Sequence, residues 1–304
     1  MKKAFIQLHI AILLAGFTGV FGKLITLNEG LLVFYRMLIS GILLLLILGI
    51  SGKLKAVSAP DFKRIAFSGF LLGMHWIFFY GSIKYSNISV GVVCFSLSGF
   101  FTSILAPIIN KKRFAISELL LSGLTLLGIV LIFSFDSQYR TGIILGVISA
   151  LLVAFYTIAN ERLAHVHKSE TIIVYQMIGG STALAILMPV YLHFFPVATL
   201  LPSLPDFGYL ILLSIFCTVL LYTLLTQALK QIPAFTINLS FNLEPVYTIA
   251  LAIFIYKENR ELTWSFYVGL GLIILSVVLQ MVKVMGLKTF QNWHPRLKTW
   301  KVRS

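Results

Sequence analysis

Ten mostly apolar stretches, each close to the length needed to cross a bilayer, run through almost the whole chain. A transmembrane helix needs about 20 consecutive apolar residues. Charged residues, or clusters of Gly, Pro and Asn, separate one stretch from the next. The stretches cover residues 5–25, 31–50, 65–83, 88–109, 117–134, 142–160, 171–190, 208–228, 233–256 and 264–283. The sequence therefore predicts an all-α integral membrane protein with ten transmembrane helices.

The composition excludes an ordinary water-soluble domain. Of the 304 residues, 59% are hydrophobic and 11% are charged, whereas soluble domains have about 25% charged residues. Ten helices leave no room for a separate soluble domain. Cys94 and Cys217 both lie inside apolar stretches, so neither a disulfide framework nor a cysteine metal site is expected. We expect no cofactor and no bound metal.

The positive charges predict the orientation in the membrane. Short loops rich in Lys and Arg stay on the cytoplasmic side. With the N-terminus inside, 18 of the 24 basic residues fall in inner segments and four in outer ones, so both termini are expected in the cytoplasm. The net charge of +14 is thus explained by basic residues that set the orientation, and no nucleic-acid partner is expected. The apolar run after Met1 is interpreted as a retained first span, because no small-residue cleavage site follows it.

Short motifs recur in the same order in both halves of the chain. Phe34–Leu38 resembles Val174–Ile178, and Pro60-Asp61-Phe62 recurs as Pro205-Asp206-Phe207. From the third predicted helix onward the offset is a constant 146 residues, and the matching pairs include Trp76 with Tyr222, Lys84 with Lys230, Phe95 with Phe241, Phe101 with Tyr247, Thr102 with Thr248, and Lys111 with Lys257. The pattern predicts two five-helix repeats at residues 5–134 and 142–283, followed by a basic cytoplasmic tail at 284–304.

An odd number of helices in each repeat makes the two halves cross the membrane in opposite directions. Such inverted repeats are typical of transporters, whose substrate site lies near the midplane between the halves. Interrupted helices often form that site. Pro245 should bend its helix near Phe241, because proline removes a backbone hydrogen bond. Gly99 holds the matching position, so Gly99 and Pro245 are the two hinge candidates.

The candidate substrate-binding or coupling residues surround these two positions. Aromatic walls with nearby hydroxyl groups suit an organic solute that has an apolar part. The residues that share helix faces or matching positions in the two repeats are Glu244, Arg36, Trp76, Phe95, Ser98, Phe101, Thr102, Tyr222, Phe241, Tyr247 and Thr248.

Two of these candidates carry charge inside an apolar stretch, and each allows two interpretations. A carboxylate near the bilayer centre is costly, so Glu244 is expected either to bind a proton or a substrate amine, or to have a structural role. In that role it caps the backbone freed by Pro245 or pairs with a basic residue. Arg36 either pairs with Glu244 or a substrate carboxylate, or has a structural role with its head group toward the bilayer surface. His75 is expected to be hydrogen-bonded packing.

These features together resemble the drug/metabolite transporter superfamily, in its ten-helix form with two EamA repeats. Arg36, the stretch Leu243–Val246, Lys257-Glu258 and Gly269-x-Gly271 carry the resemblance. One position departs from the pattern, because Lys112 stands opposite Glu258 where the family commonly has an acidic residue.

The resemblance implies a carrier of the bacterial inner membrane, often an exporter of amino acids, metabolites or drugs. A small organic substrate, protons as coupling ion and membrane lipids are the expected partners of either a monomer or a homodimer. The chain has no phosphate-binding loop, HExxH or GxSxG motif, so we expect no enzyme activity. A sensor or scaffold, and a lipid-modifying membrane enzyme, are the alternatives.

Overall fold

The computed structural model describes residues 2–111, 113–133, 139–257 and 264–293, and none of these residues forms a strand. The first half of the chain contains α1 (Lys2–Leu24), α2 (Glu29–Ile50), α3 (Ala59–Lys84), α4 (Ile88–Phe95), α5 (Leu97–Asn110) and α6 (Ile116–Phe133). The second half contains α7 (Arg140–Val166), α8 (Ser169–Phe194), α9 (Leu204–Ser214), α10 (Leu221–Leu229), α11 (Ala234–Ser240), α12 (Glu244–Tyr256) and α13 (Trp264–Trp293).

Three long helical segments change geometry in their middle. Ser96 separates α4 from α5, and the 3-10 turn Phe241–Leu243 separates α11 from α12. The π-helical segment Ile215–Leu220 joins α9 to α10. π-Helical segments inside α-helices are rare and often mark functional sites. The irregular backbone therefore lies in segments from both halves.

Eight helical segments of the described residues are long and apolar enough to cross a membrane. They are Lys2–Leu24, Glu29–Ile50, Ala59–Lys84, Ile88–Asn110, Arg140–Val166, Ser169–Phe194, Leu204–Leu229 and Ala234–Tyr256. Ile116–Leu131 and Trp264–Leu279 are shorter apolar helices. The chain is thus a multi-pass membrane protein, and the number of ten spans and their orientation stay predictions.

Matching helices of the two halves begin and end in the same way. Ser58 and Ser203 are the N-caps of α3 and α9, and each side chain accepts a hydrogen bond from the backbone N–H of the aspartate three residues on. Proline occupies the first turn of both helices, where its missing N–H costs nothing. Lys111 and Lys257 end α5 and α12 with φ of 51° and 58°, in the left-handed region. The repeated sequence thus builds repeated helix ends.

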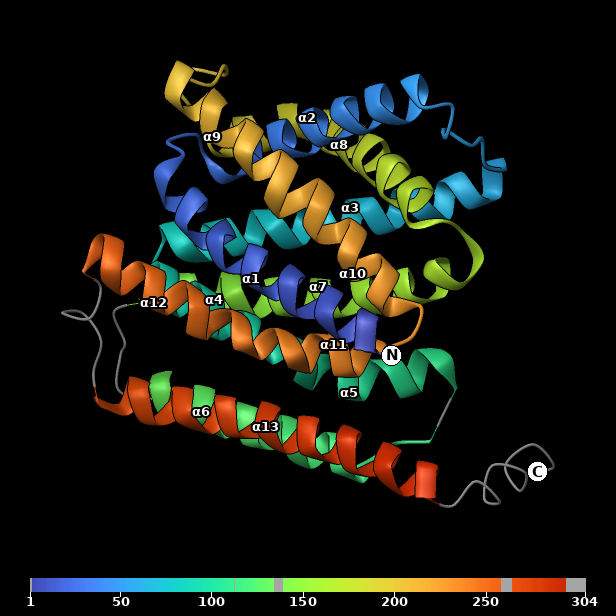
Figure 1. Cartoon of the computed structure of the whole chain (residues 1–304). Coiled ribbons are helices and arrows are strands. Elements are labelled where there is room, and N and C mark those ends of the chain that lie inside the picture. The colour runs from blue at the N-terminus through green and yellow to red at the C-terminus, as the bar shows by residue number, and fades with distance from the viewer. Residues whose placement is uncertain (1, 112, 134–138, 258–263, 294–304) are drawn as a thin grey trace.

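The helices form one bundle in which the two halves interleave. Figure 1 shows α2 and α8 along one side, α6 and α13 side by side on the opposite side, and the broken helices between them. Helix α3 packs extensively against α7 and α8, so the first half is in contact with the second. The start of α1 and the end of α13 lie at the same end of the bundle (Figure 1). This arrangement places residues of both halves at the centre.

The crossing of α3 and α8 depends on a glycine. A Cβ atom added at Gly69 would lie 2.1 Å from the backbone oxygen of Gln176, so a larger residue must separate the two helices. Small residues at such crossings let backbones approach closely in membranes. Gly123 in α6 is a suitable contrast, since an added Cβ there meets no atom of the described residues within 4 Å.

We predict that Gly69→Ala destabilises the protein and that Gly123→Ala does not. Overpacking at Gly69 should cost about 1–3 kcal/mol, because the obstructing atoms belong to backbone. Alanine favours a helix over glycine by about 1 kcal/mol, so Gly123→Ala should melt at or slightly above the wild-type temperature. Thermal melts of the purified variants in detergent measure both. Equal melting temperatures for Gly69→Ala and the wild type would contradict the close crossing.

Candidate functional site

A small cavity lies where the irregular segments of the two halves meet. Its volume is about 30 Å³, far below the roughly 300–1,000 Å³ of ligand pockets. Its lining includes six of the residues that the sequence predicts, namely Arg36, Trp76, Phe95, Tyr222, Phe241 and Glu244. Ala15, Thr18, His75, Phe79 and Leu221 complete it. In this conformation the cavity has no room for an organic solute.

Arg36 is held in place by four interactions. Its guanidinium carbon lies 3.7 Å from the centre of the Trp76 ring, a cation–π contact. Its Nη1 donates to the hydroxyl of Tyr80 at 2.8 Å. Its Nε donates to Oγ1 of Thr218 at 2.7 Å, and its Nη2 donates to the backbone oxygen of Cys217 at 2.6 Å. The side chain is 1% exposed, so the guanidinium lies in the protein interior and not at the bilayer surface.

The π-helical segment supplies two of those partners. A π-helix replaces the usual i to i+4 pairing, so it changes which carbonyl groups are paired within the helix. Thr218 and the Cys217 carbonyl both belong to this segment. Ser214, directly before the segment, donates to the backbone oxygen of Arg36 at 3.2 Å. Helix α2 of the first half is thus bonded to the second half through both the backbone and the side chain of Arg36.

Glu244 is the buried carboxylate of the cavity. It is 4% exposed and starts α12, directly after the 3-10 turn. Among the described residues, none forms a hydrogen bond with its carboxylate or an ion pair within 4.0 Å of it, although Arg36 acts on it electrostatically. An unpaired carboxylate in a low-dielectric region is costly. The alternative in which Glu244 caps the backbone freed by Pro245 is therefore not observed, and the carboxylate faces the cavity.

Two aromatic pairs join matching positions of the repeats across the centre. The indole Nε1 of Trp76 donates to the hydroxyl of Tyr222 at 3.1 Å, with the ring centres 5.4 Å apart. The rings of Phe95 and Phe241 meet edge to face at 6.1 Å. Each pair has the 146-residue offset of the repeat. The cavity wall therefore lies on the pseudo-symmetry axis between the halves.

The other five predicted candidates lie outside the cavity lining. Thr102 donates to the backbone oxygen of Ser98 at 2.7 Å and accepts from Asn238 at 2.8 Å. The hydroxyl groups of Ser98 and Thr248 are buried, with no hydrogen-bond partner among the described residues. Tyr247 is 39% exposed. Phe101 packs on Phe100, and its ring is half-buried.

The two hinge candidates occupy different positions relative to the breaks. Pro245 lies in the first turn of α12, and the irregular turn covers Phe241–Leu243 just before it. Gly99 lies inside α5, while the break occurs three residues earlier at Ser96. A Cβ added at Gly99 would lie 3.3 Å from Cδ1 of Leu239, so this glycine allows α5 to approach α11. Bending at Gly99 stays a prediction, since its observed contribution is close packing.

The position that matches Arg36 has a neutral network. Gln176 donates from Nε2 to the hydroxyl of Ser68 at 3.0 Å and to Oδ1 of Asn160 at 3.1 Å. Asn160 in turn donates to Tyr156 at 3.2 Å and to Thr226 at 3.3 Å. The two halves thus surround the cavity with similar backbones, but only the first half adds a positive charge.

Sequence reasoning missed several residues of the site. His75 is hydrogen-bonded packing as expected, with Nδ1 2.8 Å from the hydroxyl of Ser149, but it also lines the cavity, which the sequence did not predict. Thr18 lines the cavity from α1, and Thr218 binds Arg36. No charge, proline or repeat match distinguishes either threonine in the sequence. Lys112 and Glu258 lie outside the described residues.

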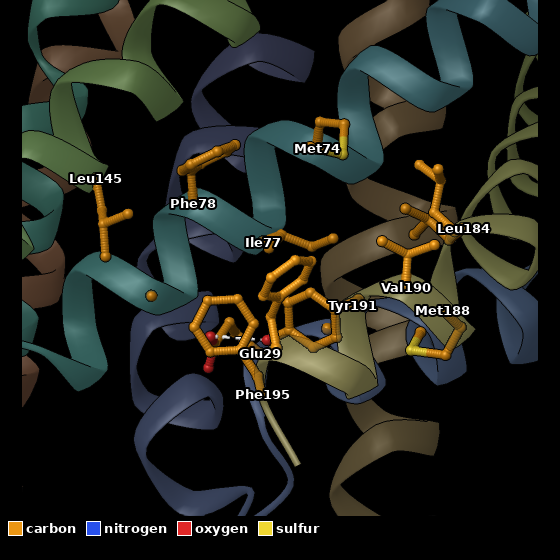
Figure 2. A pocket seen from close by; sticks show the side chains of 14 residues that line it. Glu29, Met74, Ile77, Phe78, Leu145, Leu184, Met188, Val190, Tyr191 and Phe195 are labelled. Atoms are coloured by element: carbon orange, nitrogen blue, oxygen red, sulfur yellow. Dashed lines mark hydrogen bonds between the residues drawn. The ribbon is translucent and has the colours of Figure 1, made fainter.

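A larger hollow of about 380 Å³ is a weaker candidate for the site. It lies between α2, α3, α7 and α8, and its lining is apolar except for Glu29 and Tyr191. Figure 2 shows these two residues at one end of the hollow, where the tyrosine hydroxyl donates to Oε1 of Glu29 at 2.8 Å. Val190 in its wall is 59% exposed. The two polar residues of the hollow are hydrogen-bonded to each other, whereas the central cavity contains the unpaired carboxylate of Glu244.

Known proteins similar to this chain are named as transporters. An uncharacterized transporter of Haemophilus influenzae is 24% identical over 274 residues, which cover 84% of this chain and 86% of the relative. An uncharacterized transporter of Helicobacter pylori strain J99 is 26% identical over 205 residues, covering 66% and 68%. The uncharacterized transporter YyaM of Bacillus subtilis is 23% identical over 253 residues, covering 77% and 76%.

A solved structure and a family match complete the comparison. A structure titled "Crystal structure of protein" aligns with a TM-score of 0.68 over 91% of this chain and 96% of the other, at 16% identity, and so shows the same fold. The sequence pattern of the EamA-like transporter family matches twice, at residues 2–134 and 140–282. The names and the family indicate a transporter rather than an enzyme. The chain belongs to the EamA-like transporter family, as a multi-pass membrane protein built from two EamA repeats.

Proposed function

We propose that this protein is a secondary transporter of the bacterial inner membrane, which exports a small organic solute by alternating access at the central cavity. The observation that carries the proposal is the buried, unpaired carboxylate of Glu244, which shares the cavity with the fixed guanidinium of Arg36. Because Arg36 is bonded to other protein groups and not to Glu244, the carboxylate is free to bind a positive group of a substrate or a coupling ion. Aromatic rings from both repeats form the apolar wall.

Glu244 is assigned the binding of a positive charge, either a coupling proton or an amine of the solute. A carboxylate inside a membrane is ordinarily directed at such a pathway or partner. The three guanidinium nitrogens of Arg36 all donate to protein groups, so Arg36 contributes a fixed positive charge to the site. The solute class that fits is an amphipathic molecule such as an amino acid, metabolite or drug-like compound, because aromatic walls surround few polar groups.

The proposed architecture has ten spans, in repeats at residues 5–134 and 142–283, with both termini and the tail from residue 284 in the cytoplasm. The distribution of Lys and Arg between the loops supports this orientation. Gly99 and Pro245 are proposed to contribute to the bending of their helices. Direct coupling to ATP is not part of the proposal, because the sequence has no phosphate-binding loop.

The first prediction concerns coupling. Glu244→Gln should reduce solute flux in proteoliposomes at least tenfold and remove its response to a pH gradient, because the amide cannot bind a proton or pair with an amine. Solutes that accumulate in cells lacking the gene are the substrates to test. The matched control is Glu29→Gln, which changes a half-buried carboxylate in the apolar hollow and should keep both flux and response. Normal, gradient-responsive flux through Glu244→Gln would refute this assignment.

A second prediction concerns Arg36. Arg36→Lys keeps the charge but loses the planar group that stacks on Trp76 and bonds to three partners, so transport should fall at least tenfold. The control is Arg162→Lys, since Arg162 is an exposed arginine that binds Asn110 and Ile109. Flux assays, with a melting curve to show that each variant folds, measure the effect. Equal loss of flux in both variants would contradict a special role of Arg36.

The third prediction concerns orientation. A cysteine introduced at position 301 should react with a membrane-impermeant maleimide in inside-out vesicles and remain unlabelled in intact cells. The native Cys94 and Cys217 are buried, which keeps the background labelling low. Labelling only from outside the cell would overturn the proposed topology.

A further inference from the structure

A buried carboxylate at one end of the bundle binds the loop between α1 and α2. Asp206, in the first turn of α9, accepts hydrogen bonds from the backbone N–H of Thr26 at 2.9 Å and from its Oγ1 at 2.7 Å. Asp206 is 2% exposed. At the same loop, Lys84 from the end of α3 donates to the backbone oxygen of Leu27. The second half of the chain therefore fixes a loop of the first half at this end.

A weaker contact of the same kind occurs at the other end of the bundle. Oδ1 of Asp61, in the first turn of α3, lies 3.8 Å from Nε2 of His167 in the loop between α7 and α8. The same oxygen lies 3.7 Å from Nη1 of Arg64, and Oδ2 accepts from the hydroxyl of Ser58 at 2.8 Å. Here the first half of the chain contacts a loop of the second half.

The two contacts are related by the internal repeat. Both aspartates belong to the duplicated Pro-Asp-Phe motif, and both follow a serine N-cap. Helices α3 and α9 start at opposite ends of the bundle (Figure 1). Each aspartate reaches the loop between the first two helices of the other repeat. The duplicated aspartate thus contributes a contact between the repeats at each end. Other bonds join the repeats there as well, from Tyr191 to Glu29 at the Asp206 end and from Arg162 to Ile109 and Asn110 at the Asp61 end.

Each contact borders a hollow at its own end. Thr26 and Asp206 line a hollow of about 450 Å³, and Asp61 and His167 line one of about 460 Å³. The central cavity of about 30 Å³ belongs to neither set of lining residues. Alternating access requires that one end separates while the other stays closed. Contacts between the repeats at the two ends are the bonds that such a movement must break in turn.

We propose that Thr26–Asp206 and Asp61–His167 are the two gate latches of the transport cycle. This inference rests on the proposed function and deepens it. The two latches differ in strength, because Asp206 makes two hydrogen bonds from a buried position, whereas Asp61 is 29% exposed and its partner is charged only when protonated. The Asp61–His167 latch is therefore the weaker of the two, although Arg162 also joins the repeats at this end by donating to Ile109 and Asn110. In the proposed orientation this is the cytoplasmic end, where an exporter loads its solute.

The test measures from which side the central cavity is reached. Ala15 lines the cavity and is 5% exposed, so Ala15→Cys reports access when Cys94 and Cys217 are replaced by alanine. The label is a membrane-impermeant maleimide, applied to right-side-out and to inside-out vesicles. The labelling rate from each side is proportional to the population open to that side. The measurement requires no solute.

Thr26→Val removes the side-chain hydrogen bond while keeping the shape, and should raise labelling from outside about fivefold relative to labelling from inside. Asp61→Asn removes an exposed ion pair, and should change the ratio about twofold in the opposite direction. Thr26→Ser keeps the hydroxyl and should keep the wild-type ratio. The controls, Thr199→Val and Lys63→Gln, alter neighbouring polar residues outside both latches.

The proposal is wrong if Thr26→Val leaves the ratio at the value of Thr199→Val, or if both latch variants shift it in the same direction. It is also wrong if Thr26→Ser, which retains the bond, behaves like Thr26→Val. Size-exclusion profiles show that each variant is folded, and Asp206→Asn replaces Thr26→Val if that variant aggregates, with the same expected direction. A ratio that shifts as expected in a protein that transports no solute would support the latches and refute the transport proposal.

Discussion

The fixation of Arg36 is the interaction on which the centre of this molecule depends. A guanidinium inside a bilayer is tolerated when protein groups replace its water. Trp76 covers its face, while Tyr80, Thr218 and the Cys217 carbonyl accept its hydrogen bonds. The Cys217 carbonyl and the Thr218 hydroxyl both belong to the π-helical segment Ile215–Leu220. The charge is thus bound at the place where the opposite half departs from a regular helix.

The duplicated backbone and the single charge have separate consequences. The repeat produces matching helix ends, matching aromatic pairs and matching aspartates in the first turns of α3 and α9. Arg36 and Gln176 break this symmetry, because one charge lies beside the cavity and a neutral amide network occupies the matching place. In the proposed transport cycle, the symmetric frame supplies two related ways of opening, and the asymmetric centre gives a bound solute a defined orientation.

Apolar length and the order of repeated motifs were sufficient to predict the helical membrane fold and six residues of the cavity lining. Apolar length is a property of a single helix, and the repeated motifs match helices in pairs, so both can be recognised in the sequence alone. The partners of Arg36 depend instead on where a π-turn falls, and neither Thr218 nor Ser214 carries a distinguishing pattern. The break at Ser96 could not be predicted for the same reason, because no pattern in the sequence distinguishes this serine. Gly99, which was the candidate, instead allows close packing.

The size of the cavity limits how the site can work. A volume of about 30 Å³ is far below the roughly 300–1,000 Å³ of ligand pockets, so any organic solute requires the walls to separate. Packed helices resist continuous deformation, and movement concentrates where hydrogen bonding is already irregular. Three such places, Ser96, Ile215–Leu220 and Phe241–Leu243, lie next to cavity-lining residues on their own helices. In the proposed transport cycle, the irregular turns next to Arg36 and Glu244 are therefore also the places where the bundle bends, so that binding at these charges is coupled to the opening of one end.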